Sequence, residues 1–144
     1  MNQQHHFIIE HLVEKNSFNT LVFFEKDFYT NEIFKKNWTP MSRVLVDSDL
    51  QQLIYIVDIE GEWIHLRFPI SLWKQLDKVI ANQLDLFLVM SLTEEGTASK
   101  TIPLKDFAQE GKDLIQNMRG NSNYGEGMSE LIEDKFASTI QQLV

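Results

Sequence analysis

The strongest strand pattern in the chain lies in two adjacent runs, residues 53–59 and 63–68. The first run is apolar at almost every position, as expected of a strand buried on both faces. In the second run, apolar residues alternate with a set that points to the opposite face: Trp63, His65 and Arg67. Glu60-Gly61 lies between the runs and is typical of a tight turn. The pattern therefore predicts a β-hairpin.

Other β-branched and aromatic runs predict strands on both sides of this hairpin. Residues 7–13 and 21–24 are separated by polar residues and predict a second hairpin. Residues 44–46 and 84–90 predict two more strands, and 101–104 predicts a short edge strand because its proline cannot donate a backbone hydrogen bond. The remaining local predictions are a short helix over 31–37 and turns at 47–49 and 94–96.

The second half of the chain contains three helical patterns, in which apolar residues recur every three or four positions. The first runs from about Ser71, a candidate N-cap, to Asn82. The second begins at Lys105 or Asp106 and ends near Gly120, which occupies the position where a left-handed residue closes a helix. The third begins at Ser129, again as a cap, and continues toward the C-terminus.

Strands first and helices last predict the α+β class. We expect a mostly antiparallel sheet with helices packed on one face, two of them at the C-terminus. A length of 144 residues fits one compact domain, so we expect residues 1–144 to form a single α+β domain.

The charge balance bears on the partners of the protein. Thirteen Lys and Arg against 21 Asp and Glu give a net charge of −8. This balance opposes binding to nucleic acids and to anionic membranes, so we expect neither as a partner. The N-terminus lacks the basic and apolar regions of a secretory signal, which leads us to expect a cytoplasmic location. The chain has no cysteine, and no motif indicates a cofactor.

Two polar segments resemble ligand-binding motifs. Asp47-Ser48-Asp49 matches the start of a calcium loop, but the later ligand positions are missing, which favours a turn held by short side chains. In Gly120–Gly127 two glycines have the spacing of a phosphate-binding loop, but Glu126-Gly127 replaces the required Lys and Ser or Thr. This segment, which includes Asn123 and Tyr124, therefore favours a helix–loop–helix connection. Capture of an anion or peptide beside the last helix is the alternative.

Catalytic patterns are absent from the sequence: it contains no nucleophile elbow, zinc-binding helix motif or dinucleotide fingerprint. We therefore predict no catalytic residues and no metal ligands. His65 shares its strand face with Trp63 and Arg67. Such a face is either half-exposed structural surface or, because Trp and Arg are enriched at interaction hot spots, a binding surface.

Two stretches carry a resemblance to a known family, Leu45-Val46-Asp47-Ser48-Asp49 and Gly120-Asn121-Ser122-Asn123-Tyr124-Gly125. The chain resembles uncharacterised protein family 0738, small cytoplasmic proteins of Gram-positive bacteria. The likeness covers residues 43–136, and this chain has a longer hairpin between Leu92 and Thr101. The resemblance implies a bacterial cytosolic setting. It supplies no activity, because the family has none assigned.

Two functional hypotheses follow. The favoured one is a non-catalytic binding or regulatory module for a protein partner, as a monomer or a homodimer. Its binding surface is either the strand face of Trp63, His65 and Arg67 or the loop 121–125 with the adjacent turn of Asp47 and Asp49. The alternative is a small-molecule-binding protein or enzyme with a polar pocket near residues 121–125. A pocket that joins Asp47, Asn123, Tyr124 and His65 would favour the alternative, and a flat apolar patch with Trp63 or Trp38 would favour the module. The candidate binding residues are Trp63, His65, Arg67, Asp47, Asp49, Asn123 and Tyr124.

Overall fold

The computed structural model describes residues 5–14, 19–24, 35–91, 99–125 and 127–143. The strands are β1 (His5–Glu14), β2 (Asn19–Phe24), β3 (Trp38–Asp47), β4 (Gln52–Ile59), β5 (Glu62–Pro69), β6 (Asp85–Ser91) and β7 (Ser99–Pro103). The helices are α1 (Trp73–Ala81), α2 (Phe107–Met118), α3 (Met128–Lys135) and α4 (Ala137–Gln142), with short 3-10 helices η2 (Ile70–Leu72) and η3 (Ser122–Tyr124).

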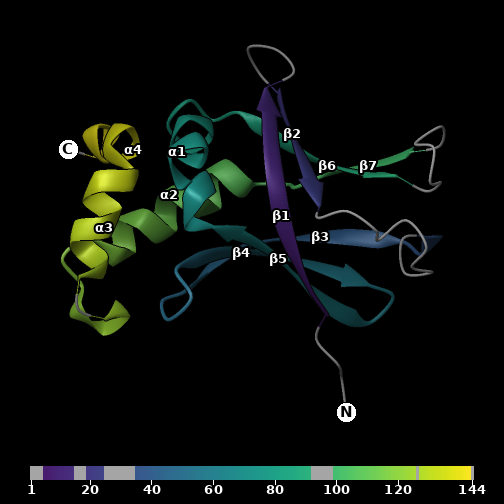
Figure 1. The fold of residues 1–144 in the computed structure, drawn as a ribbon, viewed down its shortest axis with the longest axis horizontal. Helices are drawn as coiled ribbons and strands as arrows, with labels where there is room; N and C mark the ends of the chain where they lie inside the picture. The colour runs from purple at the N-terminus through teal and green to yellow at the C-terminus, as the bar shows by residue number, and fades with distance from the viewer. Residues whose placement is uncertain (1–4, 15–18, 25–34, 92–98, 126, 144) are drawn as a thin grey trace.

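The described strands form one mixed sheet in the order β3-β4-β5-β1-β2-β6-β7. β1 is parallel to β5 and β2 is parallel to β6, whereas the other neighbouring pairs are antiparallel. β1 joins the two halves of the sheet: its first residues pair with β5 and its later residues pair with β2, with an irregularity between Ile9 and His11. Figure 1 shows β1 crossing from the group of β3, β4 and β5 to the group of β2, β6 and β7.

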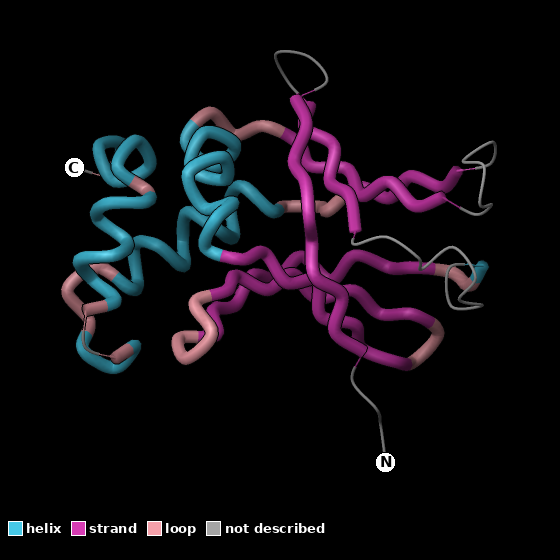
Figure 2. Tube along the Cα trace, in the orientation of Figure 1, coloured by secondary structure: helices cyan, strands magenta, loops and turns pink. Residues whose placement is uncertain are grey.

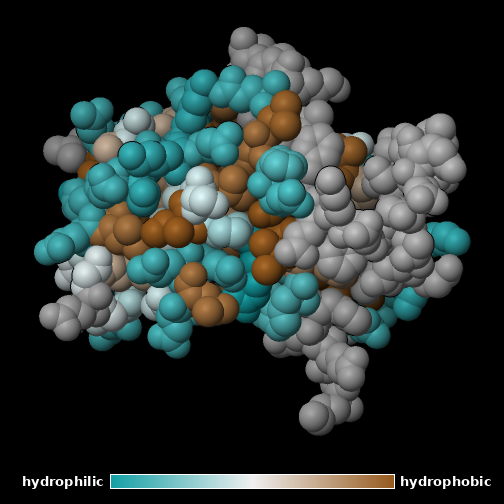
Figure 3. All heavy atoms as spheres, viewed as in Figure 1, coloured by the Kyte–Doolittle hydropathy of each residue, from teal (hydrophilic) through white to brown (hydrophobic). Residues whose placement is uncertain are grey.

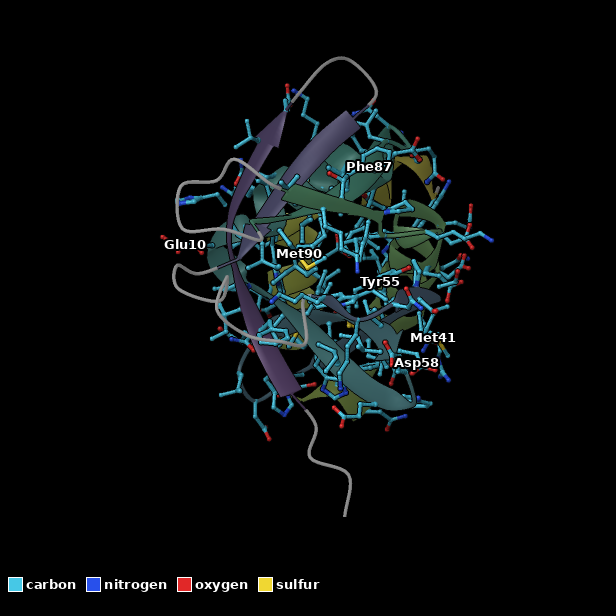
Figure 4. The ribbon with its side chains drawn as sticks, turned by 90° about the vertical axis from the view of Figure 1, so that its right-hand side faces the viewer. Glu10, Met41, Tyr55, Asp58, Phe87 and Met90 are labelled. Atoms are coloured by element: carbon cyan, nitrogen blue, oxygen red, sulfur yellow. The ribbon has the colours of Figure 1, made fainter. Side chains whose placement is uncertain are left out.

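The two halves of the sheet enclose apolar side chains between them. The edge strands β3 and β7 approach each other, and Lys100 Nζ on β7 donates a hydrogen bond to the carbonyl oxygen of Lys36, just before β3. Tyr55 on β4 and Met90 on β6 are 0% and 1% exposed. Figure 4 shows both side chains between the surrounding strands and Glu10 on the outer side of β1. The sheet therefore bends around its own core.

The helices gather at one side of the strands, as Figures 1 and 2 show. Trp73 at the start of α1 is fully buried; its ring lies 5.5 Å from that of Phe136, and its Nε1 donates to the carbonyl oxygen of Phe68 at 3.1 Å. The outward surface of this side carries mainly hydrophilic residues with hydrophobic patches between them (Figure 3). The predicted α+β class, with helices on one side of a mostly antiparallel sheet, is confirmed.

Most local predictions are confirmed. Both hairpins form, as β1–β2 and as β4–β5, and β7 lies at an edge of the sheet. Gly120 follows α2 with φ +65°, the left-handed conformation that glycine adopts without strain. Of the helix predicted over 31–37, only residues 35–37 are described, and the predicted turn at 94–96 lies outside the described residues.

Both predicted N-caps are wrong. Ser71 lies inside η2, because Pro69 is followed by a 3-10 turn, and α1 starts after Leu72 without a side-chain cap. Ser129 lies inside α3, and its hydroxyl oxygen instead accepts a hydrogen bond from the backbone N–H of Gly120 at 2.9 Å. This bond ties the start of α3 to the end of α2.

The last predicted helix is interrupted at Phe136 and forms α3 and α4. The break is stabilised from outside the segment. Asp77 on α1, which is 8% exposed, accepts hydrogen bonds from the backbone N–H groups of Ser138 and Thr139 at 3.1 and 2.8 Å. A carboxylate at the start of a helix satisfies N–H groups that have no partner within the helix.

Candidate functional site

The sheet face opposite the core, here called the outer face, is formed by alternate residues of β3, β4, β5 and β1. Its centre is Ile54 and Ile56 on β4, which are 5% and 3% exposed yet lie outside the main core cluster. Around them stand apolar side chains with larger exposure: Ile8 37%, Leu45 36% and Trp63 46%. Burial on both faces explains why the β4 sequence is apolar at nearly every position.

Strand register places the outer-face residues in rows across the sheet. Leu45, Ile54, Arg67 and Ile8 are successive partners from β3 to β1. Ile56, His65 and His6 form the next row, and Asp58 lies opposite Trp63. The alternation of Trp63, His65 and Arg67 on one face thus follows the sequence prediction, while their neighbours come from the pairing of distant strands.

Arg67 is the centre of a hydrogen-bonded cluster on this face. Its Nη1 donates to Asp47 Oδ2 at 3.0 Å and to Gln52 Oε1 at 2.9 Å, and its Nε donates to His6 Nδ1 at 3.0 Å. The Arg67 side chain is only 13% exposed. The cluster fixes the guanidinium against the sheet, so Arg67 is ordered before any partner arrives.

The cluster affects two titrating groups. The backbone N–H of Leu50 and then the Arg67 guanidinium hold the pKa of Asp47 below its usual value of 3.8. Burial, followed by the charges of His6 and Arg67, lowers the pKa of His65 from 6.5. The rings of His6 and His65 meet edge to face at 4.9 Å, and His65 Nδ1 is buried with no hydrogen-bond partner among the described residues.

We expect the protein to lose stability as the pH falls below 6.5, because the pKa of His65 is lower in the folded chain than in the unfolded one. As the pH falls, His65 is protonated in the unfolded chain before it is protonated in the folded chain. This difference lowers the free energy of unfolding by at most about 1.4 kcal/mol per pH unit. Urea unfolding at about pH 7.5 and about pH 5.5 measures the change. The His65→Gln variant should show a smaller decline; an equal decline would contradict the assignment. Asp47 causes a separate loss of stability, only below pH 3.8, where its carboxylate is protonated in the unfolded chain.

The 47–49 turn forms as predicted: Asp47 Oδ1 accepts a hydrogen bond from the backbone N–H of Leu50 at 3.1 Å. The turn lies beside the loop that follows α2 (Figures 1 and 2). Together they line an open pocket of about 510 Å³, here called the turn–loop pocket. Its lining residues are Val46, Asp47, Ser48, Asp49, Ile54, Asn123, Tyr124 and Gly125.

The loop side of this pocket is shaped by Asn121 rather than by Asn123. The side-chain oxygen of Asn121 accepts a hydrogen bond from the backbone N–H of Asn123 at 3.0 Å and thereby holds η3. Tyr124 Oη accepts a hydrogen bond from Asn117 Nδ2 at 2.7 Å. The Asn123 side chain makes no hydrogen bond to a described residue, so it does not stabilise the turn.

The structure thus places the seven predicted binding residues in two groups. Trp63, His65 and Arg67 share the outer face, and the other four line the turn–loop pocket. Asp47 joins the groups through its ion pair with Arg67. His65 does not line the pocket, although the second hypothesis would have placed it there. Trp38 packs against Phe7 and is only 8% exposed, so it is not part of an exposed apolar patch.

Sequence reasoning missed several outer-face residues: His6, Ile8, Leu45, Gln52, Ile54 and Ile56. The alternation within β1 and β3 could have pointed to them only with knowledge of which strands pair. Within the described part of the chain, no three His, Asp or Glu side chains gather as a metal site. No described helix is both long and apolar enough to span a bilayer.

Comparison with known proteins places this chain in a family. A family model described as "Family of unknown function (UPF0738)" matches residues 9–136. The chain belongs to the UPF0738 family. The match starts at residue 9 rather than at 43, so the likeness includes the later part of β1 and all of β2 as well as the two stretches at the turn–loop pocket.

UPF0738 relatives come from Gram-positive bacteria. A UPF0738 protein of Bacillus cereus strain G9842 is 30% identical over 124 residues, which cover 86% of this chain and 92% of that protein. A UPF0738 protein of Geobacillus sp. strain WCH70 is 32% identical over 97 residues, 67% of this chain and 73% of the relative. No solved structure matches the chain.

Proposed function

We propose that this UPF0738 protein is a non-catalytic protein-interaction module that binds its partner through the outer face. The observation that carries the proposal is the set of exposed apolar side chains Ile8, Leu45 and Trp63 around Ile54 and Ile56, on the side of the sheet away from the core. An apolar patch with a polar surround is typical of a protein contact surface.

Trp63 and Arg67 supply the groups that dominate binding energy at interfaces. Trp63 retains 46% exposure, so a partner that covers it would bury a large apolar ring. Arg67 is already held by three acceptors, so little side-chain entropy is lost when a partner packs over its guanidinium plane.

The partner we propose is a different, positively charged protein rather than a second copy of the chain. The net charge is −8; in the β4–β5 hairpin Asp58 lies opposite Trp63, and Glu60 and Glu62 are at the turn. Two copies that meet at this hairpin would bring like charges together, whereas a basic partner gains from long-range attraction.

The test compares capture by the wild-type chain with capture by Trp63→Ala and Leu50→Ala from a lysate of the bacterium that encodes the chain. Leu50 is the matched control because it is 61% exposed and apolar but lies on the 47–50 turn. We expect wild type and Leu50→Ala to retain one basic protein that salt releases. We expect Trp63→Ala to lose it with the melting temperature within a few degrees of wild type.

Three outcomes would contradict the proposal. The partner remains on Trp63→Ala; the captured protein is acidic and insensitive to salt; or sedimentation shows a wild-type dimer that Trp63→Ala converts to a monomer. The last result would identify the outer face as a contact between copies.

The second candidate function is binding of a small molecule, with or without catalysis, at the turn–loop pocket. It is favoured by a specific observation: Asp47, Asp49, Asn123 and Tyr124, drawn from two distant segments, line one cavity. The cavity is an open, mainly polar depression of about 510 Å³ and can receive part of a small molecule.

A further inference from the structure

We propose that the turn–loop pocket binds a positively charged group, a primary ammonium or a guanidinium. The inference rests on the second candidate function. It starts from the chemistry of the lining, which combines carboxylates, a hydroxyl, a carboxamide, a phenol ring and two aliphatic side chains.

The charge of the pocket is negative and partly uncompensated. The described residues that line it include no Lys or Arg. The carboxylate of Asp47 is paired with Arg67 at 3.0 Å, but Asp49 is exposed and its carboxylate has no ion-pair or hydrogen-bond partner among the described residues. The Asp49 carboxylate would repel an anionic ligand and attract a cationic one.

The free hydrogen-bonding groups also fit a cation with several N–H donors. The Ser48 hydroxyl and the Asn123 carboxamide make no hydrogen bond to described residues, and both offer oxygen acceptors. The Tyr124 hydroxyl is held by Asn117, which fixes the phenol at the wall, and aromatic rings attract cations. Val46 and Ile54 add apolar surface for a hydrocarbon stem.

The open form of the pocket fits the charged end of a longer molecule. The cation can therefore come from a free amine metabolite or from a basic side chain of a protein. Both sources present the same ammonium or guanidinium to Asp49, and the experiment includes a probe for each.

The test is a titration of the isotope-labelled chain followed by NMR of its backbone amides. The probes are agmatine, a capped Gly-Arg-Gly tripeptide, and inorganic phosphate as the anion. We expect saturable shifts at Ser48, Asp49 and Asn123 with the two cations and none with phosphate. Tighter binding of agmatine would point to a metabolite, and tighter binding of the tripeptide to a protein side chain. Asp49→Asn should weaken the binding about fivefold.

The matched control is Asp85→Asn, which removes one exposed carboxylate on β6 in the other half of the sheet. It should bind both cations as wild type does. Equal weakening by both variants would show general attraction to an acidic protein and would overturn the site. Saturable binding of phosphate at these amides would overturn the cation while leaving the pocket as a small-molecule site. The absence of shifts with every probe would overturn the site and the second candidate function together.

Discussion

Replacing Asp77 with alanine is expected to lower the free energy of unfolding by about 3 kcal/mol. Asp77 is 8% exposed, and its carboxylate accepts hydrogen bonds from the N–H of Ser138, the N–H of Thr139 and the Thr139 hydroxyl, the last at 2.7 Å. Alanine leaves the buried N–H of Thr139 without a partner, and the Thr139 hydroxyl keeps only the backbone carbonyl oxygen of residue 77 at 3.3 Å. The start of α4 loses its carboxylate acceptor. Urea unfolding measures the loss.

Asp134→Ala is the control for the charge itself. Asp134 is an exposed carboxylate on α3 whose ion pair with Lys135 is 3.8 Å long, and such pairs contribute little. Asp77→Asn keeps one acceptor oxygen and should fall between the two. A loss for Asp77→Ala within about 1 kcal/mol of that for Asp134→Ala would contradict the capping role.

The sequence predicted those elements whose signal is local. The β4–β5 hairpin could be predicted because Glu60-Gly61 joins two runs with clear strand periodicity, and the two runs are adjacent in the chain. The same holds for α2, where the apolar stripe ends at Gly120. In each case the residues that determine the structure lie within one window of sequence.

The parallel pairings could not be predicted in this way. β1 pairs with β5 across about sixty residues of sequence, and its partner changes to β2 between Ile8 and Ile9. Nothing local in either strand encodes the other. The same reason explains the break at Phe136, because the cap of α4 comes from Asp77 on a different helix.

The candidate site shows both situations. Alternation placed Trp63, His65 and Arg67 on one face, and turn chemistry predicted the bond from Leu50 to Asp47. The contact between Asp47 and Arg67, and the meeting of the 47–49 turn with Asn123, depend on how strands and helices pack. Sequence reasoning therefore proposed both surfaces, but not the ion pair between Asp47 and Arg67 that joins them.

Replacing Arg67 with alanine is expected to lower the free energy of unfolding by about 2 kcal/mol. The Arg67 side chain is 13% exposed, and its guanidinium donates hydrogen bonds to Asp47, Gln52 and His6. Alanine leaves three acceptors without their donor and removes the side-chain stem that packs on the sheet. Arg67→Lys keeps the charge but cannot bond to three separate acceptors in one plane, so it should lose about half as much.

The Arg67→Ala variant also separates the effect of the cluster on stability from the effect of the pocket's charge on ligand binding. Without Arg67 the carboxylate of Asp47 loses its ion pair at 3.0 Å, and the turn–loop pocket gains an uncompensated negative charge. Arg67→Ala should therefore be less stable than wild type yet bind agmatine more tightly, whereas Arg67→Lys should bind it as wild type does. A general loosening of the fold would weaken agmatine binding in proportion to stability. Tighter binding in the less stable variant would show that the charge around Asp47, and not the stability of the fold, determines the affinity for agmatine.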